Sequence, residues 1–277
     1  MENMENPSSS AEEWRRSHDR EEVLDFDGLG PLLVLSGGRR LHLGPPRQRA
    51  VLGLLLINAN HLLSADSIIE SIWEGEPPPQ ATAALYAYLS RLRRSLSGEG
   101  WPSLLVRQNP GYVLAVSPEQ MATHRFERAV SEGERFLRQG DHRASGRLMA
   151  DALGMWRDTP YADLGRYDFS ARESVRLEAV RLVAVEGLAE SLLSQGDPHA
   201  VVGLLYTEIQ ANPFRENLVH HFMTALYLSG RRVDALKVYE QTRSRLAGEM
   251  GVDPGKELRD LHQDVLQQNQ VRKRPSS

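Results

Sequence analysis

Apolar residues recur with helical spacing in residues 82–96, whose sequence is T-A-A-L-Y-A-Y-L-S-R-L-R-R-S-L. The leucines have the i, i+4, i+7, i+11 spacing of one buried helical face; they are Leu85, Leu89, Leu92 and Leu96. The opposite face carries small residues at its start and arginines, without a carboxylate, at its end. Such a face can approach another surface closely and bind anionic groups, as a helix in a DNA groove does. The alternative is a solvated basic stripe on a core helix.

The pattern before this helix predicts a small sheet followed by two more helices. Short apolar runs, the turn sequence S-G-G and the alternating L-H-L that follows it predict an antiparallel sheet over residues 24–43. Pro45-Pro46 then opens a helix over residues 47–58, because proline is tolerated in a first helical turn. Ser64 is a good N-cap for the next helix, which ends before a triple proline.

The pattern after the 82–96 helix predicts a β-hairpin. Two short apolar strands, 104–106 and 112–114, flank the turn-like stretch R-Q-N-P-G. A sheet, three helices and a terminal hairpin in this order make an α+β winged helix-turn-helix. We therefore predict a DNA-binding domain over residues 23–116, preceded by a flexible arm at 1–22.

Beyond this domain the pattern becomes all-helical, with segments of about 15 residues separated by glycine, proline and asparagine. Residues 191–206 align with residues 225–240 after a shift of 34 residues, which is the period of tetratricopeptide helix pairs. We predict stacked helix pairs with a concave interaction surface over 117–268, and a flexible basic tail at 269–277. An ordinary helical bundle with coincidental glycines is the alternative.

The composition is that of a globular protein and excludes several classes. The 277 residues are 40% hydrophobic and 25% charged, which suits two domains with cores of their own. The chain has no cysteine, so it has neither a disulfide framework nor a cysteine-ligated metal. No apolar run reaches the roughly 18 residues of a membrane span, and the polar N-terminus is no secretory signal. We expect a cytoplasmic protein without a membrane partner.

The net charge of −4 looks unsuitable for binding DNA until it is divided along the chain. Residues 1–25 hold 3 basic and 8 acidic side chains, residues 26–116 hold 8 and 6, and residues 117–277 hold 22 and 23. The basic charge is therefore local to the predicted winged helix, and local charge governs phosphate contact. The patch is modest, which favours binding by more than one copy of the protein.

The sequence gives little support to an enzyme or a metalloprotein. Its nine histidines show no metal-ligand spacing, and there is no H-E-x-x-H motif. The stretch G-V-D-P-G-K-E at 251–257 resembles a P-loop only faintly. It is one residue short between its glycines, and Glu257 stands where the magnesium-binding hydroxyl belongs. We expect no catalytic residue, metal or cofactor.

The predicted recognition helix and its surroundings supply the candidate DNA contacts. Arg91, the main candidate, and Arg94 can make bidentate contacts to guanine edges or clamp phosphates. The alanines permit close approach, hydroxyls reach phosphate oxygens, and Arg93 suits a backbone contact. The helix candidates are Thr82, Ala83, Ala87, Tyr88, Ser90, Arg91, Arg93 and Arg94. The wing and phosphate candidates are Arg107, Gln108, Asn109, Arg47 and Arg49. For the three arginines, the alternative is an ordinary solvated side chain without a DNA contact.

Stretches across both halves resemble the Streptomyces antibiotic regulatory proteins, activators with an OmpR-like winged helix followed by a bacterial transcriptional activation domain. The likeness covers about residues 24–268, and its stretches keep the family's order and spacing. In the first half they are L-G-P-L-L-V (29–34), G-P-P-R-Q-R-A-V-L (44–52), W-E-G-E-P-P (73–78), Y-L-S-R-L-R-R-S-L (88–96) and P-G-Y-V-L (110–114). In the second half they are H-R-F-E-R (124–128), W-R (156–157), P-Y-A-D-L (160–164), N-P-F-R-E (212–216) and G-V-D-P-G-K-E-L-R-D-L-H (251–262).

The resemblance implies an activator of a secondary-metabolite (antibiotic) gene cluster. Such proteins bind direct repeats in double-stranded promoter DNA beside the −35 element, commonly as side-by-side protomers, and recruit RNA polymerase holoenzyme through its sigma factor. Matching positions place Tyr88, Arg91 and Arg93 toward DNA. They assign the RNA polymerase contact to a loop that contains Trp73, Glu74, Glu76, Pro77, Pro78 and Gln80.

The sequence departs from the family pattern in the wing and in the recognition helix. The usual wing arginine is Gln108 here, with Arg107 one residue earlier, and Tyr86 replaces a polar residue, which predicts a different base preference. We expect neither the nucleotide-binding and sensor domains of longer relatives nor a phosphorylatable receiver domain. Two other hypotheses are a ligand-gated regulator whose helical domain senses a small molecule or peptide, and a tetratricopeptide adaptor without a DNA role.

Overall fold

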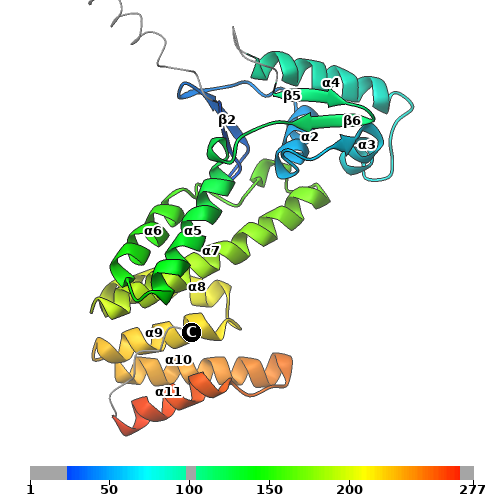
Figure 1. Ribbon diagram of the computed structural model, residues 1–277. Coiled ribbons are helices and arrows are strands. Elements are labelled where there is room, and N and C mark those ends of the chain that lie inside the picture. The colour runs from blue at the N-terminus through cyan, green and yellow to red at the C-terminus, as the bar shows by residue number, and fades with distance from the viewer. Residues whose placement is uncertain (1–23, 98–103, 269–277) are drawn as a thin grey trace, which may run out of the picture. The chain divides into compact units, whose positions relative to one another are not determined.

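The computed structural model describes residues 24–97 and 104–268; the predicted arm and basic tail lie outside the described residues. The described chain is mainly helical, with two small sheets, as predicted (Figure 1). It forms two compact units. Unit 1 comprises Met1–Arg125 and Trp156–Leu177, and unit 2 comprises Phe126–Met155 and Glu178–Ser277. The second part of unit 1 comes from the middle of the helical half of the sequence.

The N-terminal sheet is antiparallel, with the strand order β1-β2-β3. Its strands are β1 (Leu24–Asp27), β2 (Leu33–Ser36) and β3 (Arg39–Arg40). The predicted sheet is confirmed, but its last strand begins two residues before the alternating segment 41–43. Gly37 and Gly38 both have positive φ, 53° and 81°, and form a two-residue turn that pairs Ser36 with Arg39.

Three helices follow, close to their predicted bounds: α2 (Pro46–Ile57), α3 (Ala65–Trp73) and α4 (Ala81–Leu96). The Ser64 hydroxyl accepts a hydrogen bond from the Ser67 amide at 3.0 Å, which confirms the predicted N-cap of α3. The four leucines of α4 are at most 2% exposed. Burial of each leucine contributes about 1.5–3 kcal/mol, so this face anchors α4 and leaves the other face to solvent.

The second sheet has the strand order β4-β6-β5 and lies beside α4 (Figure 1). Its strands are β4 (Leu63–Ser64), β5 (Leu105–Gln108) and β6 (Gly111–Leu114). The predicted hairpin is confirmed, with a shorter turn than the sequence indicates, so that Arg107 and Gln108 belong to β5. Strand β4 escaped prediction because a two-residue strand has no alternating pattern.

Residues 156–164 are fastened to the N-terminal sheet and to α2 within unit 1. The Arg157 guanidinium donates to Asp27 Oδ2 at 2.6 Å and to the Pro31 carbonyl at 2.9 Å. Asp163 accepts a hydrogen bond from the Leu32 amide at 2.7 Å and pairs with Arg49 of α2 at 3.0 Å. These contacts join segments more than 100 residues apart in sequence.

Leu164 lies at the centre of this attachment. Its side chain is fully buried, and Gly53 of α2 leaves room for it: a Cβ added at Gly53 would lie 2.4 Å from Leu164 Cδ1. We expect Leu164→Ala to lower the free energy of unfolding by about 2–5 kcal/mol, the usual cost of a leucine-sized cavity. Chemical denaturation measures this change. The control is Leu62→Ala, since Leu62 is 43% exposed; equal, small losses in both variants would contradict the attachment.

Unit 2 is built from helices connected by tight turns. Its elements, in part shared with unit 1, are α5 (Ala122–Arg138), α6 (His142–Gly154), α7 (Asp168–Ser194), α8 (Pro198–Ala211), α9 (Glu216–Leu228), α10 (Arg232–Arg245) and α11 (Lys256–Gln267). Helix α7 has 27 residues, more than the predicted segment length. The repeat glycines Gly140, Gly196 and Gly230 all have positive φ and end the helices before them. Asp141 and Asp197 then cap α6 and α8.

Ion pairs and burial hold the helices of unit 2 together. Helix α9 packs against α8, α10 and α11 (Figure 1). Arg181 of α7 makes a bidentate pair with Glu208 of α8, with both distances 2.8 Å, and these hydrogen bonds raise the pKa of Arg181. Between α10 and α11, the His262 ring stacks on the Tyr239 ring with 3.8 Å between their centroids, and burial lowers the pKa of the His262 imidazole.

In the part of the chain that the structure describes, no helix has the length and apolarity needed to cross a membrane.

Candidate nucleic-acid interface

The outward face of α4 presents most of the predicted DNA contacts to solvent. Its exposed residues are Thr82, Ala83, Tyr86, Ser90, Arg91 and Arg94, and Ala87, Tyr88 and Arg93 are half-buried at its edges. Neither Arg91 nor Arg94 has a hydrogen bond or an ion pair to any described residue, so both guanidinium groups retain their donors. The face has small side chains near its N-terminal end, which permits a close approach to another surface.

Arg93 has a structural role in addition to any contact with DNA. Its Nε and Nη2 donate to the Leu105 carbonyl at 3.2 and 3.1 Å, which joins α4 to β5. The predicted contact of Arg93 with the DNA backbone therefore uses a guanidinium group that already holds β5 in place. A guanidinium has five N–H donors, so two bonds leave donors for a phosphate.

The exposed edge of the wing lies on β5 and the turn that follows it. Arg107, Gln108 and Asn109 are all exposed, and Arg107 pairs with the buried Tyr112 of β6 across the hairpin. The Arg107 side chain likewise has no partner among the described residues. Whether Arg107 or Gln108 contacts DNA stays a prediction.

Two residues that the sequence did not single out as functional position the wing. The side chain of Asn60 donates to the Val116 carbonyl at 2.9 Å and accepts from the Val116 amide at 3.1 Å. Gly111 lies so close to β4 that an added Cβ would be 1.8 Å from the Leu63 carbonyl oxygen. In the sequence, Asn60 could be noticed only as an asparagine that follows a helix. Gly111 could be noticed as a glycine within a predicted strand region, where glycine often marks a close approach of two backbones.

The two candidate phosphate contacts of α2 differ. Arg47 is exposed, and its guanidinium lies 5.9 Å from the centre of the Trp73 ring. Arg49 is half-buried and pairs with Asp163 at 3.0 Å. Arg47 is therefore the stronger candidate of the two, because Asp163 already pairs with the Arg49 guanidinium. The sequence could not reveal a partner 114 residues away.

The predicted polymerase loop needs one correction. Trp73 is the last residue of α3 and only 8% exposed, so its ring belongs to the core and offers little surface to RNA polymerase. The loop turns at Glu74 and Gly75, which both have positive φ. It exposes two carboxylates and a proline-rich surface; the exposed residues are Glu74, Glu76, Pro77, Pro78 and Gln80.

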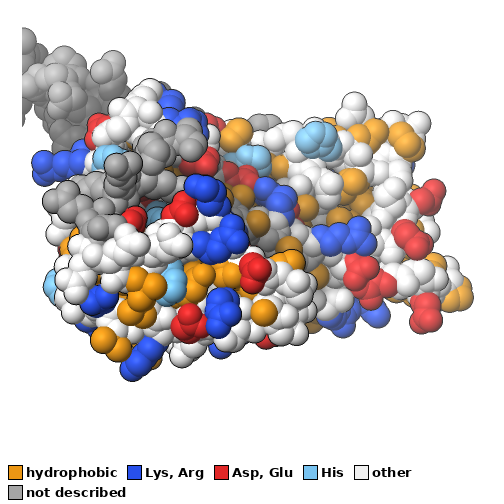
Figure 2. Space-filling model, turned by 90° about the horizontal axis from the view of Figure 1, so that it is seen from below, with side chains coloured by type: hydrophobic (Ala, Val, Ile, Leu, Met, Phe, Trp, Pro, Cys, Tyr) orange, Lys and Arg blue, Asp and Glu red, His pale blue; other side chains and the backbone are white. Residues whose placement is uncertain are grey.

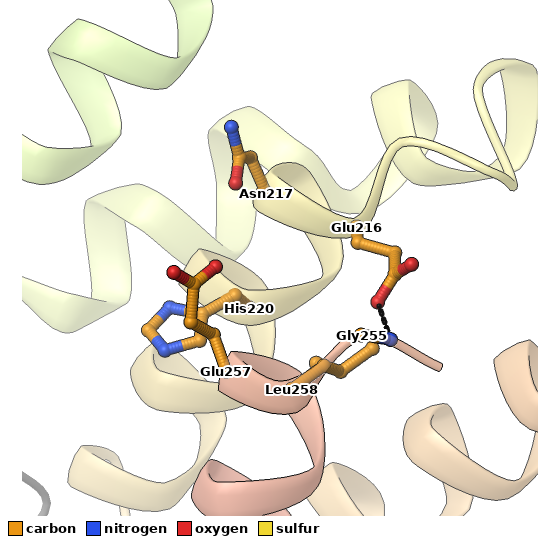
Figure 3. Close-up of a pocket in the computed structure, with 6 residues that line it drawn as sticks. All are labelled: Glu216, Asn217, His220, Gly255, Glu257 and Leu258. Carbon is orange, nitrogen blue, oxygen red and sulfur yellow. Dashed lines mark hydrogen bonds between the residues drawn. The ribbon is translucent and has the colours of Figure 1, made fainter. Parts of the chain in front are cut away.

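The P-loop-like stretch closes a small cavity between α9 and α11 (Figure 3). The Gly255 amide donates to the Glu216 carboxylate at 2.7 Å, and Glu257 lies beside His220. Because carboxylates occupy the place of a phosphate, this turn does not form a phosphate cradle. The cavity measures about 140 Å³.

The wing and α4 differ from the helices of unit 2 in their balance of basic and acidic side chains. Basic and acidic side chains are interspersed over the face seen in Figure 2. Several arginines of unit 2 are paired, for example Arg215 with Glu186 and Arg243 with Glu240. From residue 81 to 116, by contrast, four arginines stand against one glutamate. The fold and the outward face of α4 therefore define a winged-helix protein with a candidate nucleic-acid-binding surface.

Comparison with known proteins gives the same assignment. The family model described as "Transcriptional regulatory protein, C terminal" matches residues 38–114, and "Bacterial transcriptional activator domain" matches residues 123–266. The transcriptional regulatory protein EmbR of Mycobacterium tuberculosis is 34% identical over 90% of this chain, which spans 64% of that relative's length. The transcriptional regulator RedD of Streptomyces coelicolor is 30% identical over a region that covers 92% of this chain and 73% of the length of RedD.

A solved structure of M. tuberculosis EmbR, in complex with a low-affinity phosphopeptide, matches with a TM-score of 0.87 and 33% identity over 91% of this chain and 67% of that one. The fold and the relatives define a DNA-binding transcriptional regulator. The chain belongs to the Streptomyces antibiotic regulatory protein family, with an OmpR-like winged helix and a bacterial transcriptional activator domain. The family and fold class predicted from the sequence are confirmed.

Proposed function

We propose that this regulator activates a secondary-metabolite (antibiotic) gene cluster by binding short direct repeats beside the promoter −35 element. The observation that carries the proposal is the outward face of α4, where Arg91 and Arg94 are exposed and have no hydrogen-bond or ion-pair partner among the described residues. Side-by-side binding by two protomers is supported by the modest size of the basic surface, since a second copy multiplies the contacts without enlarging either interface.

Activation in this proposal comes from a contact with RNA polymerase holoenzyme, including its sigma factor. The 74–80 loop supports it, because the loop directly precedes α4 and is exposed along its length. Transcription reconstituted from a target promoter with purified holoenzyme tests the function. The full chain is expected to raise transcript yield from promoters with the repeats, and unchanged yield would contradict activation.

Neutralising the loop carboxylates is expected to separate activation from DNA binding. In the variant Glu74→Gln/Glu76→Gln we expect transcript yield to fall by about fivefold, the effect of losing contacts worth about 1 kcal/mol. Promoter affinity should not fall, because the change removes negative charge near DNA. Glu132→Gln/Glu249→Gln makes the same charge change at two exposed sites of unit 2 and is the control. Equal yields from both variants would contradict the loop assignment.

A further inference from the structure

A cavity of about 250 Å³ lies in unit 1 between the N-terminal sheet and the start of α2. One part of its lining is cationic or polar and comes from Arg40, His42 and Arg49; the apolar part comes from Leu32, Leu41 and Leu43. No acidic residue lines it. Such a lining suits a small ligand with an anionic group at one end and an apolar body at the other.

The backbone around the cavity adds to its preference for an anion. Gly44, which completes the lining, lies two residues before α2, whose N-cap is Pro45. The first turn of α2 contains no acidic residue, and no side chain caps its free amides. The amide groups of a helix N-terminus carry partial positive charge, which stabilises an anion nearby.

A buried side-chain amide in the first turn of α2 has an acceptor without a partner. Gln48 is 3% exposed, and its Nε2 donates to the Leu43 carbonyl at 3.0 Å. Its Oε1 has no hydrogen-bond partner among the described residues, and a Cβ added at Gly44 would lie 3.2 Å from that oxygen. A buried acceptor without a partner is costly, so a water molecule that donates to it is favoured there.

We propose that this cavity is a binding site for an anionic phosphate group, with Arg40 as its principal cation. Arg40 is exposed and has no ion pair to a described residue, whereas Arg49 is shared with Asp163. A phosphate in the cavity competes with Asp163 for the Arg49 guanidinium. Binding therefore weakens one of the contacts that fasten residues 156–164 to α2, which couples the site to the attachment described above. The phosphate comes from a small metabolite or from the DNA backbone.

Phenyl phosphate is the probe for the first source, because it joins a phosphate group to a small apolar body. Calorimetric titration of the full chain is expected to show saturable binding, which Arg40→Ala weakens by about tenfold or more. Arg39→Ala is the matched control: successive residues of a strand point to opposite faces, and Arg39 does not line the cavity. Benzyl alcohol, which lacks the phosphate, should not bind.

A second variant changes affinity in the opposite direction. Asp163→Asn removes the competing charge but keeps an oxygen for the Leu32 amide, so phenyl phosphate should bind this variant more tightly than the unmodified chain. A purely structural role for Asp163 would lower affinity. Thermal unfolding without ligand verifies that each variant is folded.

The second possible source of the phosphate, the DNA backbone, is tested by measuring the affinity of the chain for promoter DNA. If phenyl phosphate does not bind, but Arg40→Ala alone weakens DNA binding and lowers its salt dependence by about one phosphate contact, the group belongs to the DNA backbone. If neither probe responds to Arg40→Ala, or if Arg39→Ala has the same effect as Arg40→Ala, the cavity is not a phosphate site and the proposal is wrong.

Discussion

Replacing Arg91 with alanine is expected to weaken binding to the target promoter by about 5- to 150-fold, or about 1–3 kcal/mol, if Arg91 reads a guanine edge. The physical reason is the position of Arg91 on the exposed face of α4, opposite the leucines that anchor the helix. Removing an exposed side chain without intramolecular partners should leave the fold intact. Fluorescence anisotropy with promoter and unrelated duplexes measures the change.

Two further variants distinguish base reading from charge. Arg91→Lys keeps the charge but loses the bidentate fork, so specific binding should fall while binding to unrelated DNA is retained. Arg147→Ala removes an exposed arginine of α6 in unit 2 and should change promoter affinity by no more than about twofold. If Arg91→Ala weakens both duplexes equally, Arg91 contacts phosphate only. If it weakens neither, the assignment of α4 as the recognition helix is wrong.

Replacing Gly111 with alanine is expected to destabilise the winged helix strongly. The added Cβ would lie 1.8 Å from the Leu63 carbonyl oxygen and 2.7 Å from Ser64 Cα, both backbone atoms of β4. Strands β4 and β6 must then separate, which costs on the order of 3 kcal/mol or more. Thermal unfolding should shift down by about 6–12 °C, and promoter affinity should fall because β6 and β5 form the wing.

Gly203→Ala is the matched control for this prediction. Gly203 is an exposed residue of α8, and an added Cβ meets no atom within 4 Å. Alanine is favoured over glycine in a helix by about 0.5–1 kcal/mol, so this variant should be slightly more stable. Similar unfolding temperatures for Gly111→Ala and the unmodified chain would contradict the close pairing of β4 with β6.

Local patterns predicted the winged helix well because its helices are strongly periodic. The leucine spacing of α4 and the N-cap at Ser64 depend on neighbours within a few residues, and both are confirmed. The exposure of Arg91 follows from the same periodicity. Strand β4 was missed because it is held by pairing with β6, about 50 residues away, and not by a pattern of its own.

Long-range partners explain the remaining differences. Arg49 looks like a phosphate contact until Asp163 is placed beside it, and Trp73 looks like an exposed loop residue until its burial is known. The sequence placed residues 156–164 in the helical domain by their position along the chain. Their contacts with β1 and α2 are made by single side chains, and a periodicity argument cannot detect such contacts.

Footprinting of the full chain on the promoters of its neighbouring genes, with and without RNA polymerase holoenzyme, tests the central claim most directly. We predict protection of at least two short direct repeats, spaced about one helical turn (roughly 10.5 bp) apart and adjoining the −35 element. Holoenzyme should extend the protected region, and Arg91→Ala should raise the protein concentration needed for protection by about 5- to 150-fold. Protection that Arg91→Ala leaves unchanged, or no protection on any of these promoters, would contradict the account.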